Sequence, residues 1–69
     1  MECKFYTQNT ATINGRHVWH YLISTPIGDI HVIEHEEPGK EVTDDYLGFS
    51  NQKAEKKFDQ MCRKILKGN

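Results

Sequence analysis

The fold is decided by residues 13–24, which read Ile13-Asn14-Gly15-Arg16-His17-Val18-Trp19-His20-Tyr21-Leu22-Ile23-Ser24. Asn14 and Gly15 both tolerate a positive φ, so this pair favours the type I′ turn that joins two antiparallel strands. The residues after the turn are mostly aromatic or β-branched, which is typical of a strand. We therefore expect a hairpin with strands over about residues 3–13 and 16–24.

A third strand and a helix follow this hairpin. Pro26 and Gly28 indicate a turn, and residues 29–35 then have a strand composition. Ser50 is a suitable N-cap for a helix over about residues 51–67. Within that range the apolar residues recur with the helical period: Ala54, Phe58, Met61, Cys62, Ile65 and Leu66. The predicted fold is α+β, a single domain (residues 1–69) with a three-stranded antiparallel β-meander, a loop over 36–49 and one C-terminal helix.

The turn lengths predict which residues share a face of the sheet. A two-residue and a four-residue loop pair Ile13 with Arg16, Tyr6 with Ile23 and Tyr21 with Val32. One face then holds Tyr6, Trp19, Tyr21, Ile23, Ile30 and Val32, and the other holds Phe5, Thr7, Val18, His20, Leu22, His31, Ile33 and His35. The first face carries the larger apolar groups, so we expect the helix to pack on it.

Length and composition limit the class of protein. The chain has 69 residues, of which 36% are hydrophobic and 28% charged, as in a folded globular domain. It contains no apolar run of about 18 residues, and its start lacks a signal-peptide pattern, so we expect a cytoplasmic protein outside the membrane. Cys3 and Cys62 are expected to be thiols. A chain this short buries little apolar surface, so we expect a partner, most simply a second copy in a homodimer.

The net charge of −1 conceals an uneven distribution. Residues 1–49 contain three basic and eight acidic residues, whereas residues 50–69 contain six basic and two acidic ones. A charge asymmetry of this kind orients encounters with a charged partner over about one Debye length, roughly 8–10 Å.

The histidines are the most conspicuous candidates for chemistry. His20 lies diagonal to His31 and His35 in the predicted register, but those two are four residues apart on one strand, which is about 13 Å. Zinc–nitrogen bonds are only about 2.0–2.1 Å long, so we expect neither a metal site nor a cofactor. No serine or cysteine has a histidine and an acid at a spacing typical of a nucleophile, and we expect no catalytic residues and no enzyme.

Residues 48–57, Gly48-Phe49-Ser50-Asn51-Gln52-Lys53-Ala54-Glu55-Lys56-Lys57, resemble the strand-to-helix entry of integrase arm-binding domains. In outline, the predicted meander and helix also resemble AP2-like domains, in which the sheet enters the major groove of DNA. The resemblance implies a nucleic-acid contact through the basic helix residues: Lys53, Lys56, Lys57, Arg63 and Lys64. The expected third strand carries acidic residues where the family has basic ones, which would repel phosphates.

The favoured hypothesis is a non-catalytic interaction module that binds and covers a partner protein. Small domains with an acidic front are frequent among phage and mobile-element regulators, including inhibitors of host defence proteins. The expected partner-binding residues are Phe5, Val18, His20, Leu22, His31, Ile33, Glu34, Glu36, Glu37, Asp44 and Asp45. The alternatives are the DNA-binding module described above and a homodimer of unknown role.

Overall fold

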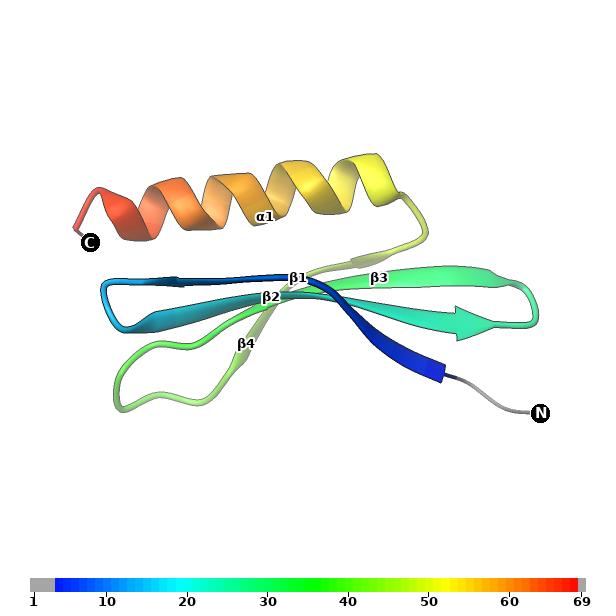
Figure 1. Ribbon diagram of the computed structural model, residues 1–69, viewed down its shortest axis with the longest axis horizontal. Coiled ribbons are helices and arrows are strands. Elements are labelled where there is room, and N and C mark those ends of the chain that lie inside the picture. Colours follow the sequence, from blue (N-terminus) through cyan, green and yellow to red (C-terminus); the bar gives the residue numbers. More distant parts are fainter. Residues whose placement is uncertain (1–3, 69) are drawn as a thin grey trace.

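The computed structural model describes residues 4–68. One antiparallel sheet of four strands carries a C-terminal helix on one of its faces (Figure 1). The elements are β1 (Lys4–Ile13), β2 (Arg16–Thr25), β3 (Gly28–His35), β4 (Thr43–Gly48) and α1 (Asn51–Leu66). Strands neighbouring in the sequence are neighbours in the sheet. The α+β class, the meander and the C-terminal helix were therefore predicted correctly.

The local signals at the first turn and at the helix start are confirmed. Asn14 and Gly15 have φ values of 53° and 76°, the positive values that a type I′ turn requires. The Ser50 hydroxyl accepts a hydrogen bond from the Lys53 amide at 3.2 Å, which caps the first turn of α1. None of the described residues forms a helix with the length and apolar character needed to cross a bilayer.

The prediction of three strands was wrong, because part of the expected loop 36–49 forms β4. Its Tyr46 pairs with Ile33 and its Leu47 with Val32. Pairing with β3 supplies the hydrogen bonds that stabilise this short acidic strand, and that long-range contact has no local sequence signal.

The register of β1 differs from the prediction at one point. Ile13 pairs with Arg16 and Tyr21 with Val32 as expected, but a β-bulge between Thr7 and Asn9 shifts the rest of β1 by one residue. Tyr6 therefore pairs with Leu22 instead of Ile23. A one-residue shift exchanges the faces of a strand. It moves Phe5 and Thr7 to the face of Trp19 and Tyr21. Residue 3, the expected start of this strand, lies outside the described residues.

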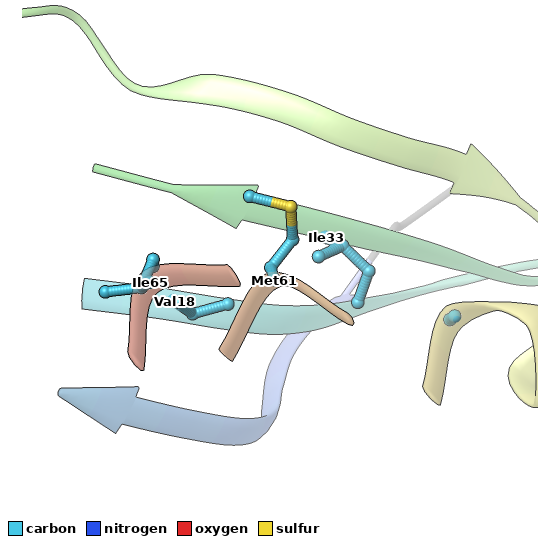
Figure 2. Packing of buried hydrophobic residues seen from close by; sticks show 5 residues of the cluster. Val18, Ile33, Met61 and Ile65 are labelled. Carbon is cyan, nitrogen blue, oxygen red and sulfur yellow. The ribbon is translucent and has the colours of Figure 1, made fainter. Parts of the chain in front are cut away.

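The choice of the helix-covered face was wrong. Val18 and Ile33 of the sheet are fully buried against Met61 and Ile65 of α1 (Figure 2). These strand residues belong to the face on which His20, His31 and His35 also lie, and not to the face of Trp19. The core thus formed on the face with the smaller apolar side chains.

Several contacts explain this position of the helix. Val18 and Ile33 are compact and β-branched, and Ala54, fully buried on α1, permits a close approach between helix and sheet. Asn14 at the hairpin tip donates a hydrogen bond to the Ile65 carbonyl at 3.2 Å, near the end of α1. At the helix start, Gln8 of the β-bulge donates one to the Asn51 side chain at 3.0 Å. The helix is therefore attached at its start to β1 and near its end to the turn between β1 and β2.

Candidate functional site

The histidines beneath α1 form a buried pair. Nε2 of His20 and Nδ1 of His31 are 3.0 Å apart, and the two residues are 1% and 5% exposed. Burial lowers the pKa of His20, and the neighbouring His31 lowers it further, while Glu55 opposes both effects. One ring donates a hydrogen bond to the other, so each satisfies the other's buried nitrogen.

His35 is satisfied by the loop and strand that follow it. Its Nδ1 donates to Oδ2 of Asp45 at 2.6 Å, and its Nε2 lies 3.7 Å from Oε1 of Glu37. The irregular pairing of β3 with β4 between Ile33 and Glu34 lets Asp45 turn toward His35. Asp45 and Glu37, two of the five carboxylates named in the sequence hypothesis, therefore have a structural partner.

A polar hollow lies between β1 and α1 beside the histidine pair. It has a volume of about 380 Å³ and is lined by Gln8, Asn9, His20, Glu55, Phe58 and Asp59. Within residues 4–68 no group of three or more His, Cys, Asp or Glu side chains is arranged to hold a metal ion. Burial, assisted by Asp59, raises the pKa of the Cys62 thiol, which makes it a weak nucleophile.

The opposite side of the sheet has a different character. We call it the open face, because α1 lies on the other side (Figure 1). Its members follow from the pairing of the strands: Phe5, Thr7, Thr10, Thr12, His17, Trp19, Tyr21, Ile23, Ile30, Val32, Glu34, Asp44 and Leu47. Phe5 and Leu47 are more than two-thirds exposed, and Trp19 and Tyr21 are half-buried.

Three rings form a stacked row along β2 on the open face. The centroids of His17 and Trp19 are 5.7 Å apart with planes at 28°, and those of Trp19 and Tyr21 are 6.3 Å apart at 11°. Stacking fixes each ring against the next, so the row is an ordered, partly exposed aromatic surface. Binding to such a surface requires little loss of side-chain freedom.

Acidic side chains border this aromatic row. Glu34 lies opposite Trp19 on one side and opposite Asp44 on the other, and Glu36 lies 3.7 Å from His17. Burial raises the pKa of Glu34, and its hydrogen bond with Asp44 and the charge of Asp44 raise it further. Burial, and then the charge of Glu34, raise the pKa of Tyr21.

The structure separates the predicted partner-binding residues into groups. Phe5, Glu34, Asp44 and Glu36 border or lie on the open face. Val18, His20, His31 and Ile33 are buried beneath α1, and Leu22 is half-buried on that side. Glu37 and Asp45 surround His35. A partner therefore has access to the first group and not to the four buried residues.

Sequence reasoning did not assign Trp19, Tyr21 and Leu47 to a binding surface. The alternation of β2 correctly predicts that Trp19 and Tyr21 share a face, but their size wrongly predicts that this face is the core. Leu47 belongs to β4, which was not expected. The position of α1 identifies the open face. That position depends on long-range contacts, which have no local signal in the sequence.

The basic helix residues lie in the other layer of the molecule. Lys53, Lys56, Lys57, Arg63 and Lys64 are on α1, where Arg63 donates to Asp59 at 3.0 Å. The sheet face that would enter a DNA groove in an AP2-like arrangement is the open face, with Glu34 and Asp44. The helix cations and this face point to opposite sides of the sheet.

No family model, no curated protein and no solved structure matches the chain.

Proposed function

We propose that the chain is a non-catalytic interaction module that uses its open face to bind and cover a partner protein. The observation that carries this proposal is the stacked row of His17, Trp19 and Tyr21 on a sheet face without a helix. Ordered Trp and Tyr side chains are the residues most enriched where single contacts dominate binding energy. Phe5 on β1 and Leu47 on β4 extend the same apolar surface across the sheet.

The border of acidic groups favours a partner with a basic surface. Glu34, Glu36 and Asp44 lie along one side of the aromatic row, and complementary charge accelerates the encounter of two proteins. The partner we favour is a host protein bound by a phage or mobile-element regulator in the cytoplasm. This placement rests on the frequency of small acidic binding domains among such regulators.

Capture experiments with single variants test the proposal. We expect the tagged full chain to retain a specific protein from a lysate, and Trp19→Ala to weaken retention at least about 10-fold. Leu66→Ala is the matched control, because Leu66 is an exposed apolar residue of α1. Far-UV circular dichroism checks that both variants fold. Retention unchanged by Trp19→Ala, or lost equally with Leu66→Ala, would contradict a role for the open face.

A homodimer is the competing explanation for the exposed apolar surface. Light scattering over a range of concentrations separates the two. A monomer mass for the wild type at micromolar concentration would leave the open face free for a different protein. A doubled mass that Trp19→Ala returns to the monomer would assign the open face to a second copy instead of a different protein.

The position of the charges argues against the rival DNA-binding function. A duplex facing the open face would meet Glu34 and Asp44, while the helix cations would lie on the far side of the sheet. We therefore expect no retardation of duplex DNA at about 50 mM salt, where phosphate contacts are strongest. Retardation that Lys56→Ala and Lys57→Ala weaken would favour the rival.

A further inference from the structure

A hollow of about 310 Å³ lies on the open face, at the end of the aromatic row. It is lined by Phe5, Tyr6, Thr7, Tyr21 and Glu34. Thr7 pairs with Tyr21 across β1 and β2, and Phe5 pairs with Ile23 next to it, so the hollow spans these two strands and reaches Glu34 of β3. Its lining therefore combines aromatic rings with a carboxylate, the two kinds of group that attract an organic cation.

The carboxylate of this hollow is not balanced by a nearby cation of the sheet. Glu34 pairs directly with Asp44 of β4, which places two acidic groups side by side. Among the strand residues that the structure describes, none of the open-face positions is a lysine or an arginine. Like charges opposite one another in a sheet are destabilising, so a positive group from outside would relieve this contact.

We propose that the hollow binds the guanidinium group of an arginine side chain from the partner protein. The plane of the guanidinium would stack on Tyr21, and its N–H groups would donate to the two carboxylate oxygens of Glu34. A guanidinium fits this set better than an ammonium group, because it is flat and carries donors in a fork that two carboxylate oxygens can accept. The inference rests on the proposed function, since it names the chemistry of the partner's central contact.

The first test uses the wild-type chain and two small probes. N-acetyl-arginine methylamide has the cationic group, and the citrulline analogue has nearly the same shape without the charge. In an NMR titration we expect the arginine probe to shift the ring signals of Phe5 and Tyr21 saturably, with a dissociation constant on the order of millimolar for one side chain. We expect the citrulline probe to bind at least 10-fold more weakly.

The second test uses variants of equal charge. Glu34→Gln removes the carboxylate of the hollow and should weaken the arginine probe at least 10-fold. Glu41→Gln removes one negative charge from the exposed loop before β4 and should leave binding within 2-fold of the wild type. Circular dichroism spectra check that both variants are folded. Equal losses in the two variants would show that general charge attraction causes binding, and would overturn the site.

The remaining outcomes separate this inference from the proposed function. Equal binding of the arginine and citrulline probes, or equal binding of a lysine probe, overturns the guanidinium assignment. If the arginine probe fails while Trp19→Ala still abolishes capture, the hollow is not the site and the open face remains the binding surface. If Trp19→Ala has no effect on capture while the arginine probe binds, the proposed role of Trp19 in capture is contradicted and the hollow remains a guanidinium site.

Discussion

The face of the sheet beneath α1 carries three buried histidines, whereas the open face carries the tryptophan, Tyr21 and Leu47. The histidine rings can be buried beneath α1 because their nitrogens have hydrogen-bond partners. His20 and His31 are partners at 3.0 Å, and Asp45 accepts a hydrogen bond from His35. The aromatic rings stay partly exposed and stack along β2. The comparison shows that paired polar groups can join a core, while large apolar groups remain outside it.

The largest expected difference between the faces concerns stability. Ile65 is 3% exposed in the contact between α1 and the sheet, and Ile65→Ala should lower the free energy of unfolding by about 2–5 kcal/mol. Leu66, the next residue, is 69% exposed, so Leu66→Ala should change it by less than about 0.5 kcal/mol. Urea unfolding of both variants measures the difference. Equal losses would mean that α1 does not pack as described.

The histidine pair gives the second-largest effect. His20→Leu leaves a buried nitrogen of His31 without its partner and should lower the free energy of unfolding by about 1–3 kcal/mol at pH 7.5. Thermal unfolding measured by circular dichroism gives this loss. His17→Leu is the control, because His17 is exposed on the open face. A loss in His17→Leu as large as that in His20→Leu would contradict the role of the buried pair.

The same pair predicts a pH dependence. The pKa of folded His20 lies below 6.5, the ordinary value, so the unfolded chain takes up a proton first as the pH falls. The contribution of His20 to stability is therefore fully present above pH 6.5 and is lost as the pH falls through the lowered pKa of the folded chain. His20→Leu should show a smaller decline over the same range. An identical pH profile for the wild type and the variant would show that His20 does not titrate in this way.

Much of the fold could be predicted from local sequence. Asn14-Gly15 fixes a hairpin through its positive φ values, and Ser50 with the apolar period of residues 51–66 fixes the helix. These signals act within a few residues. The pairing of Tyr21 with Val32 followed from the turn length alone.

Features that depend on distant contacts could not be predicted in this way. β4 is a strand because β3 pairs with it, and the bulge at Gln8 exchanges the faces of Phe5 and Tyr6 without a local signal. The prediction of which sheet face α1 covers was wrong, because it treats histidine as a polar residue that stays in contact with water. Whether a histidine can be buried depends on its partner in space, and that partner is known only once the register and the helix position are known.

Trp19→Ala provides a direct comparison with the core variant. It removes more atoms than Ile65→Ala, but Trp19 is only half-buried and its loss opens no cavity between sheet and helix. We expect it to lower the free energy of unfolding by about 1 kcal/mol, through lost stacking and partial burial. Urea unfolding of Trp19→Ala and Ile65→Ala shows which variant loses more free energy of unfolding. A larger loss for Trp19→Ala than for Ile65→Ala would place the main core on the open face.

The smallest expected effect is a gain in stability. At pH 7, Glu34→Gln should raise the free energy of unfolding by about 0.2–1 kcal/mol, because it removes one of two like charges that face each other across β3 and β4. Thermal unfolding as a function of pH measures this gain. Asp29→Asn, a charge change at an exposed position near the turn before β3, should have no comparable effect.

The pH dependence of this gain has a definite sign. The pKa of Glu34 is above 4.5 in the folded chain, so repulsion is fully present above that raised pKa and absent below pH 4.5, where the carboxyl is protonated in both states. The advantage of Glu34→Gln should therefore disappear as the pH falls to that point. A gain that persists at pH 3.5 would show that packing, and not charge, causes it. A gain confined to neutral pH would mean that the open face retains a carboxylate at the expense of stability, as expected for a group that binds a cation.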